Sequence, residues 1–139
     1  MKLTPADFEG SWQISRQITD FRIVESGTLE GEVTFTPHAQ GLLYTERGTL
    51  RFAGGAPMAA ERSYIWSFTD TDVFVAYADG APFHSFPMTG GPEATPHLCG
   101  EDMYRGTYSF VSFPDWKVTW SVKGPRKDYR SVTTYQRGR

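Results

Sequence analysis

Three charged residues stand where the sequence predicts side chains that face a protein interior. Arg16, Glu46 and Arg62 each alternate along the chain with apolar or aromatic residues. Charged groups are seldom buried unless they are paired or meet a ligand. A buried arginine can orient an anion, and a carboxylate can act as a general base. These three residues are therefore the first candidates for chemistry.

Counting residues across two predicted hairpins brings two of these charges together. Arg16 falls level with about Glu30 or Gly31, and Gly31 falls beside Glu46 or Arg47, so Gly31 leaves room between the charges. We predict an interior Arg16–Glu46 pair, to within about two residues of register. This pair is either a structural ion pair that fixes the strand order or a pair that serves binding or catalysis. A further alternative is a bulge in one of these strands, which would turn its charged side chain outward.

Arg62 has no evident partner in the neighbouring strand. We therefore predict that its guanidinium meets an anionic ligand. Lys127 and Tyr129 share one face of a later polar turn, and they either enter the mouth of the same interior or lie in solvent.

A second group of reactive side chains lies within residues 97–102. His97 and Cys99 point the same way in an extended chain, and His84 can approach from another strand. His97 and Cys99 are candidates for zinc, and His84 or His97 for haem iron, but the repeated spacing of zinc sites is missing. Cys99 is also a candidate nucleophile with His97 as its base. The structural alternative is a buried cysteine beside a hydrogen-bonded histidine, so we predict no cofactor.

The elements that position these residues are predicted to be short strands. Residues 10–18 alternate strictly between apolar and polar positions, which is typical of a strand with one buried face. The same pattern recurs in later segments, and no window has a helical period of 3.6 residues. A one-turn helix is expected at Thr4-Pro5, and Asp79-Gly80 predicts a tight hairpin. The other segments predicted as strands are 27–35, 42–50, 62–68, 73–77, 83–86, 104–110, 116–123 and a last strand that ends at Arg137.

Nine or ten such strands with short connections predict an all-β fold, a closed antiparallel up-and-down barrel. Closure removes the exposed edges that an open sheet of that size would have. Aromatic residues make up 15% of the chain, with 14 glycines and 9 prolines, a composition that favours strands and turns. Residues 1–139 are expected to form one domain.

Composition also excludes classes of partner. The net charge is −2 with no basic stripe, which argues against nucleic acid. No apolar run is long enough for a membrane span or a signal peptide, and a single cysteine excludes an intrachain disulfide. We expect a cytoplasmic protein without a membrane partner. The sequence allows a homodimer, and it allows the loop of residues 87–96 to act as a lid.

Two patterns resemble known families. Gly10-x-Trp12 on the first strand, with Arg137 on the last, resembles the signature of calycin barrels, the lipocalin-like group, in which these residues would close the barrel floor. Additional motifs spread over nearly the whole chain resemble an uncharacterised bacterial family of about this length. Its usual basic residue after Asp-Gly is replaced here by Ala81. These motifs are Tyr44-x-Glu46-x-Gly48, Arg62-x-Tyr64-x-Trp66, Phe83-His84-x-Phe86, His97-x-Cys99-x-x-Asp102-x-Tyr104 and Gly124-Pro125-x-Lys127-Asp128-Tyr129.

The resemblance implies a single-domain, lipocalin-like barrel and no transferable activity. On the chemistry of the residues, the first hypothesis is a barrel that binds a small aromatic or apolar ligand with an anionic group. Its predicted lining comprises Arg16, Tyr44, Glu46, Arg62, Tyr64, Trp66, His84, Tyr104, Tyr108 and Trp120.

The alternative is an enzyme on the same barrel, an isomerase, cyclase or hydrolase of a small acid or carbonyl compound. Glu46 or His84 would be its general base, and Tyr104 or Arg62 would stabilise an oxyanion. A Glu46 with a raised pKa and no arginine partner would favour the enzyme, and a saturated Arg16–Glu46 pair would favour binding. A third possibility is an interaction protein whose barrel is filled by its own aromatic residues.

Overall fold

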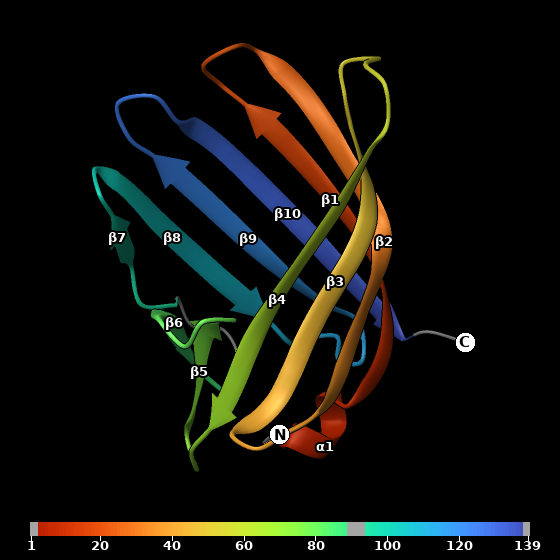
Figure 1. Ribbon diagram of the computed structural model, residues 1–139, viewed down its shortest axis with the longest axis vertical. Coiled ribbons are helices and arrows are strands. Elements are labelled where there is room, and N and C mark those ends of the chain that lie inside the picture. Colours follow the sequence, from red (N-terminus) through yellow and green to blue (C-terminus); the bar gives the residue numbers. More distant parts are fainter. Residues whose placement is uncertain (1–2, 89–93, 138–139) are drawn as a thin grey trace.

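The computed structural model describes residues 3–88 and 94–137, which form a ten-stranded antiparallel sheet and one short helix (Figure 1). Within these residues no helix has the length and apolar character that a membrane crossing requires. The elements are α1 (Pro5–Phe8), β1 (Gly10–Asp20), β2 (Glu25–His38), β3 (Gly41–Phe52), β4 (Met58–Phe68), β5 (Asp72–Tyr77), β6 (Pro82–Pro87), β7 (His97–Cys99), β8 (Asp102–Ser109), β9 (Trp116–Lys123) and β10 (Asp128–Arg137).

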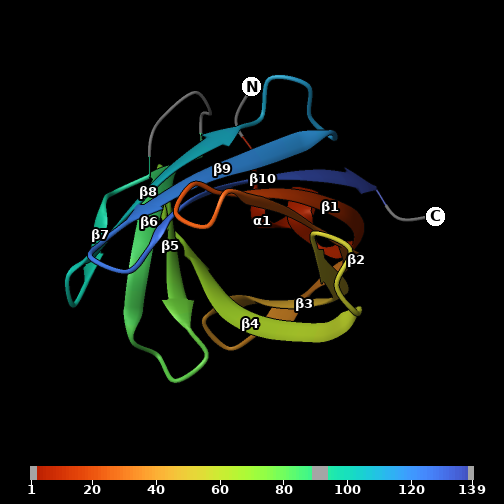
Figure 2. The ribbon, with the colours of Figure 1, turned by 90° about the horizontal axis from the view of Figure 1, so that it is seen from above.

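The sheet curls into a barrel. Its strands are ordered β6-β5-β4-β3-β2-β1-β10-β9-β8-β7, so each strand pairs with its neighbours along the chain except at β6 and β7, which form the two ends of the sheet. Strand β10 returns to lie against β1. Figure 2 shows the strands running around a common axis. The predicted up-and-down antiparallel barrel is confirmed, with ten strands and the expected helical turn at its start.

Residues 94 and 95 join the two sides of the barrel that no ladder connects. The Thr95 amide donates to the Ser85 carbonyl at 2.8 Å, and the Ser85 amide donates to Thr95 Oγ1 at 2.9 Å. The Ala94 amide donates to the Gly106 carbonyl at 2.9 Å. This segment therefore satisfies backbone groups of both β6 and β8, and the barrel is nearly closed.

The end of the barrel beside α1 is filled by aromatic side chains. Phe8 is 1% exposed, and its ring lies 5.4 Å from that of Trp66 and 5.7 Å from that of Trp116, between centroids. Trp12 is fully buried and its indole N–H donates to the Phe8 carbonyl at 2.8 Å. Tilted and edge-to-face rings of this kind pack densely, so this half of the barrel is a solid floor.

Arg137 seals the floor from outside. Its guanidinium carbon lies 4.0 Å from the centroid of the Trp12 ring, and Nη2 donates to the Asp7 carbonyl at 2.9 Å. The structural role predicted for Trp12 and Arg137 is confirmed. Helix α1 is held in place by Asp7, whose carboxylate accepts hydrogen bonds from the Thr4 amide at 2.7 Å and the Thr4 hydroxyl at 3.0 Å.

The register of the first two hairpins differs by one residue from the values counted in the sequence. Arg16 is opposite Leu29, and Gly31 is opposite Gly48. Both differences arise in turns, where the number of unpaired residues cannot be read from an alternating pattern. The two glycines let the backbones of β2 and β3 approach closely, because a Cβ on Gly31 would overlap the Arg47 carbonyl oxygen.

Candidate functional site

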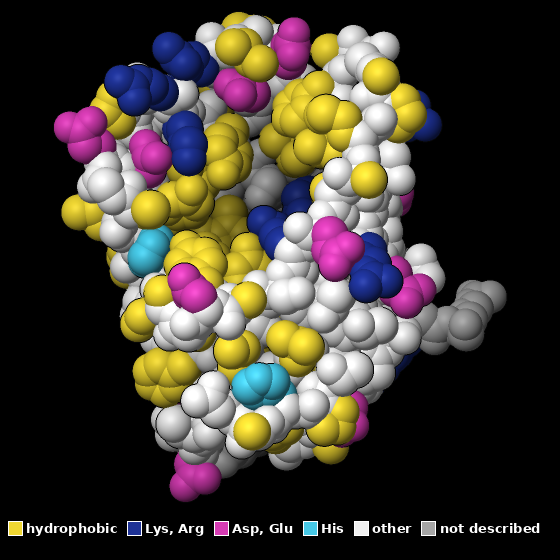
Figure 3. Space-filling view, viewed as in Figure 1, with side chains coloured by type: hydrophobic (Ala, Val, Ile, Leu, Met, Phe, Trp, Pro, Cys, Tyr) yellow, Lys and Arg dark blue, Asp and Glu magenta, His cyan; other side chains and the backbone are white. Residues whose placement is uncertain are grey.

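Above the aromatic floor the barrel encloses a cavity of about 530 Å3. That volume lies in the range of sites for small organic ligands, roughly 300–1,000 Å3. Figure 3 shows the molecule hollowed at this place, with apolar side chains around the hollow and basic side chains inside it. The basic residues that line the cavity are Arg16 and Arg62.

The walls of the cavity differ in character. One wall comes from β1 to β4 and is mixed: it contains the charged cluster and several aromatic rings, together with the aliphatic side chains Ile18, Leu29, Leu50 and Ala60. The other comes from the strands on the far side of the barrel and is aromatic, with Tyr77, Phe83, Tyr104, Tyr108 and Trp120. The Phe83 and Trp120 rings are stacked, with centroids 5.3 Å apart and planes 15° from parallel.

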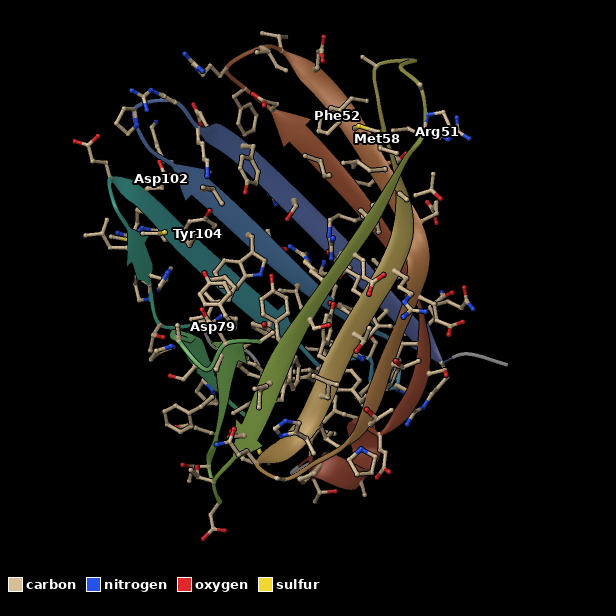
Figure 4. The ribbon with its side chains drawn as sticks, in the orientation of Figure 1. Arg51, Phe52, Met58, Asp79, Asp102 and Tyr104 are labelled. Atoms are coloured by element: carbon tan, nitrogen blue, oxygen red, sulfur yellow. The ribbon has the colours of Figure 1, made fainter. Side chains whose placement is uncertain are left out.

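The mouth of the cavity lies at the end of the barrel away from α1. Figure 4 shows Phe52 and Met58 on one side of this end and Asp102 and Tyr104 on the other. Lys127 Nζ lies 3.4 Å from Asp102 Oδ2, which ties the β9–β10 turn to β8. The sequence left open whether Lys127 and Tyr129 enter the mouth of the barrel or lie in solvent. Tyr129 lines the cavity, whereas Lys127 is half exposed in this ion pair.

Arg16 and Glu46 form the predicted interior pair. Arg16 Nη1 donates to Glu46 Oε2 and Nη2 donates to Oε1, each at 2.8 Å, and the two side chains are 8% and 3% exposed. The Arg16 Nε–H donates to Thr133 Oγ1 at 2.7 Å. This bidentate geometry is the strongest form of arginine–carboxylate contact. Arg16 is thereby fixed on three sides.

The prediction that Arg62 lacks a partner was wrong. Arg62 is directly opposite Glu46 in the β3–β4 ladder, and its Nε–H donates to Glu46 Oε2 at 3.0 Å. The sequence count considered the β1–β2 and β2–β3 hairpins and left out the third strand that borders Glu46. Within the described ranges, however, the terminal nitrogens Nη1 and Nη2 of Arg62 make no hydrogen bond, and the side chain is 48% exposed to the hollow.

Two tyrosines complete the shell around Glu46. The Tyr44 hydroxyl donates to Glu46 Oε1 at 2.8 Å and lies 2.7 Å from the Tyr135 hydroxyl. Since the single hydroxyl proton of Tyr44 is used in the hydrogen bond to Glu46, the Tyr135 hydroxyl must be the donor in the hydrogen bond between the two tyrosines. Burial raises the pKa of Tyr44 well above its ordinary value and that of Tyr135 to about 12, so both are neutral donors at pH 7.

The Glu46 carboxylate is consequently saturated and ionised. It accepts four hydrogen bonds, from Arg16 twice, from Arg62 and from Tyr44. Burial by itself raises the pKa of Glu46, but the hydrogen bonds of Arg16 and the charge of Arg62 outweigh it and lower the pKa to about 2. The cluster has two positive charges and one negative charge, a net charge of +1.

His84 lies deeper along the aromatic wall. Its Nε2 is 2.8 Å from the Tyr108 hydroxyl, and its Nδ1 is buried without a hydrogen-bond partner. Burial and the nearby His97 lower the pKa of His84 to about 3, so the imidazole is neutral at pH 7. If the Tyr108 hydroxyl donates to Nε2, the only unsatisfied buried group of this pair is the N–H on Nδ1. If Nε2–H donates to Tyr108 instead, both the Tyr108 hydroxyl proton and the Nδ1 lone pair are left without a partner. The favoured tautomer therefore has its proton on Nδ1.

The residues proposed for metal or thiol chemistry lie apart from the charged cluster. His97 packs against rings of the upper wall, 5.1 Å from that of Phe83, and Cys99 is exposed on β7. No three metal-ligating side chains come together in the described residues. The loop suggested as a lid, residues 87–96, lies partly outside the described residues.

All ten residues predicted to line an interior lie on the wall of this one cavity. Sequence reasoning missed Thr133 and Tyr135, which bind Arg16 and Tyr44 from β10. The signal was present in the pairing of Trp12 with Arg137, because stepping two residues at a time along this ladder brings Ile14 to Tyr135 and Arg16 to Thr133.

Comparison with protein families identifies the chain over most of its length. Residues 8–137 match the family of unknown function DUF6314. The chain belongs to this family. The predicted resemblance to an uncharacterised family is thus confirmed in that general form, and no curated protein matches the sequence.

Two solved structures are similar to the DUF6314 barrel. The S-type phycobiliprotein lyase CPES from Guillardia theta has a TM-score of 0.67 at 10% identity, over 97% of this chain and 90% of that one. A DUF3598 protein of unknown function from Nostoc punctiforme has a TM-score of 0.57 at 9% identity, over 96% of this chain and 48% of that one. At such identities the similarity is one of fold.

Proposed function

We propose that this DUF6314 protein is a binding barrel for a small ligand that has an apolar, ring-containing body and an anionic group. The observation that carries the proposal is the free end of Arg62. Its Nη1 and Nη2 lie within a cavity of about 530 Å3, and neither is used by the described residues. A cluster of net charge +1 at the bottom of an apolar hollow favours an anion there.

The state of the two predicted bases favours binding over catalysis. The four hydrogen bonds to Glu46 leave it no free lone pair, and its pKa of about 2 makes it a poor acceptor at neutral pH. His84 has a pKa of about 3, and its Nε2 is engaged by Tyr108. A saturated Arg16–Glu46 pair, as found here, supports a binding protein over an enzyme.

The size of the apolar lining supports useful affinity. A ligand that buries ~200 Å2 of apolar surface gains roughly 5 kcal/mol before the cost of immobilisation. The charge contact with Arg62 would add selectivity. The barrel of the phycobiliprotein lyase has a similar fold, but a likeness of fold does not bring its activity to this chain.

Fluorescence of 1-anilinonaphthalene-8-sulfonate, an aromatic anion, tests the proposal. We expect saturable binding by the purified protein and a loss of at least about tenfold in affinity for Arg62→Gln, since a charge-assisted contact is worth about 1.5–3 kcal/mol and about 1.4 kcal/mol is a factor of ten. Arg47→Gln is the matched control, because Arg47 is 73% exposed in its ion pair with Glu61 on the outer face. Absence of saturable binding, or equal losses in both variants, would contradict the proposal.

Native mass spectrometry of protein purified from its own host gives an independent measurement. A co-purifying molecule of defined mass that is lost from Arg62→Gln and kept by Arg47→Gln is the expected result.

A further inference from the structure

We propose that the anionic group of the ligand is a single carboxylate on a flat aromatic acid, bound end-on by Nη1 and Nη2 of Arg62. This inference rests on the proposed function and specifies its ligand class. Three features of the cavity lead to it: the shape of the free arginine edge, the charge of the cluster and the stacked rings of the aromatic wall.

The free edge of Arg62 has the shape of a carboxylate site. A guanidinium is planar, and the Nε–H of Arg62 is occupied by Glu46 Oε2 at 3.0 Å. The edge that remains has one N–H on Nη1 and one on Nη2 pointing the same way, which matches the two oxygens of a carboxylate in one plane. A sulfonate or phosphonate can also place two oxygens on this edge, but its third oxygen lies out of the plane, where the guanidinium offers no donor.

The charge of the cluster fits a monoanion. Arg16 and Arg62 face one carboxylate, that of Glu46, so one negative charge on the ligand makes the site neutral. Two other acidic residues line the cavity. Glu61 pairs with Arg47 on the exposed face, whereas the Asp20 carboxylate accepts the Arg22 and Ile23 amides and keeps its negative charge, which further disfavours a second negative charge on the ligand. A dianion would leave an excess negative charge in an apolar enclosure, which is costly.

The aromatic wall fits a flat ring. Phe83 is stacked against both Tyr77 and Trp120, with ring planes 13° and 15° apart, so these three side chains form a run of stacked rings on the cavity wall. Tyr64 links this run to the charged cluster, because its ring is 5.8 Å from that of Phe83 and 5.6 Å from the Arg62 guanidinium carbon. Aliphatic residues of β2 and β3 face this run from the other wall. An aromatic ring can therefore pack against this run of rings, in a stacked or edge-to-face contact, while its carboxylate reaches Arg62.

A set of naphthalene compounds with one ring system and different head groups tests the assignment by isothermal titration calorimetry. We expect 2-naphthoate to bind at least tenfold more tightly than 2-naphthamide, 2-naphthalenesulfonate and 2-naphthylphosphonate. Decanoate, a monocarboxylate of comparable apolar size without a ring, is expected to bind at least fivefold more weakly than 2-naphthoate. Arg62→Lys keeps the positive charge and removes the planar edge, so it should abolish the preference for carboxylate over sulfonate.

The outcomes separate this inference from the proposed function. Binding of 1-anilinonaphthalene-8-sulfonate that depends on Arg62, together with equal affinities for naphthoate and naphthalenesulfonate, leaves the binding function standing and overturns the carboxylate assignment. Tighter binding of the phosphonate, or a carboxylate preference that survives in Arg62→Lys, also overturns it. If no anion binds in any measurement, the proposed function fails as well.

Discussion

At the scale of single residues, Glu46 determines the electrostatics of the interior. Its carboxylate accepts two hydrogen bonds from Arg16 and one from Arg62, and it also accepts a hydrogen bond from the Tyr44 hydroxyl. An ion pair of this kind adds little net stability relative to an apolar alternative, because both ions lose their hydration. Its value here is that it orients Arg62 and leaves the outer edge of that guanidinium free.

Removing the charge of Glu46 should destabilise the protein strongly. Glu46→Gln leaves two cations without their counter-ion, and breaking a buried pair in this way costs about 3–5 kcal/mol. Urea unfolding at pH 7 measures the loss. Glu61→Gln is the matched control, because its ion pair with Arg47 is exposed and should change stability by less than about 1 kcal/mol. Equal effects of the two substitutions would show that the interior cluster is not coupled as described.

The pH dependence of stability should contain a component from His84. Its pKa is about 3 in the folded protein and 6.5 in the unfolded chain, so only the unfolded chain takes up this proton in between. Stability is fully present above pH 6.5 and falls as the pH decreases toward 3, by up to about 1.4 kcal/mol per pH unit. Urea unfolding between pH 7 and pH 5 should show this slope.

His84→Gln removes the titrating group while keeping a polar side chain beside Tyr108, and it should flatten the slope between pH 7 and pH 5. Below pH 4.5 a second decrease is expected from Glu46, whose folded pKa of about 2 lies under its ordinary 4.5. That second decrease should be absent from Glu46→Gln. A wild-type stability that is constant from pH 7 to pH 5 would contradict the first assignment.

At the scale of elements, close contact between β2 and β3 sets the position of Glu46. Gly31 and Gly48 are opposite each other, and this pair leaves the two backbones room to approach. Leu29 and Val33 flank Gly31 on the same face of β2, and each is less than 5% exposed. The strand therefore packs tightly, and the backbone of β3 occupies the space that a side chain at Gly31 would need.

A side chain at Gly31 should disturb this contact. A Cβ there would lie 2.6 Å from the Gly48 Cα and closer still to the Arg47 carbonyl oxygen, and backbone atoms cannot move away cheaply. We expect Gly31→Ala to lose about 1–3 kcal/mol in urea unfolding, as overpacked sites do. Gly54→Asn is the control, because nothing lies within 4 Å of a Cβ at Gly54 and asparagine tolerates its φ of +79°. A neutral Gly31→Ala would mean that the strands are farther apart than described.

The elements also show what an alternating pattern can and cannot reveal. Alternation states which residues share a face, so the ten lining residues could be assigned to one interior without knowing the register. It does not state how many residues a turn leaves unpaired, and the hairpin counts were one residue out for this reason. The partner of Arg62 was missed because it depends on a third strand. Thr133 and Tyr135 lie on a polar strand, residues 128–137, whose inward face has no apolar signature.

At the scale of the whole molecule, the barrel is divided by height. The half beside α1 is packed solid with aromatic rings, and the half toward the mouth is hollow. The barrel is therefore filled by its own side chains only in the half beside α1, and not throughout. This division lets the floor supply stability while the upper walls remain available to a ligand.

The barrel closes through the hydrogen bonds of Thr95, and this closure can be weakened selectively. Thr95→Val keeps the shape of the side chain but removes the acceptor of the Ser85 amide. We expect faster hydrogen exchange at Ser85 and its neighbours on β6, with exchange on β2 and β3 unchanged. Exchange measured by NMR at single amides decides this. Uniform acceleration across the sheet would instead indicate a global loss of stability.

The placement of the indoles has a practical consequence. The chain has four tryptophans, and Trp12, Trp66 and Trp116 are buried at 2% exposure or less; of these three, Trp66 alone lines the cavity, at its closed end. Trp120 stands partly open in the wall beside Phe83. A guest molecule would change the surroundings of this one fluorophore far more than those of the other three. The protein thus contains its own optical reporter of occupancy, and a Trp120→Phe variant should lose most of the change in emission as the hollow fills, with the remainder coming from Trp66.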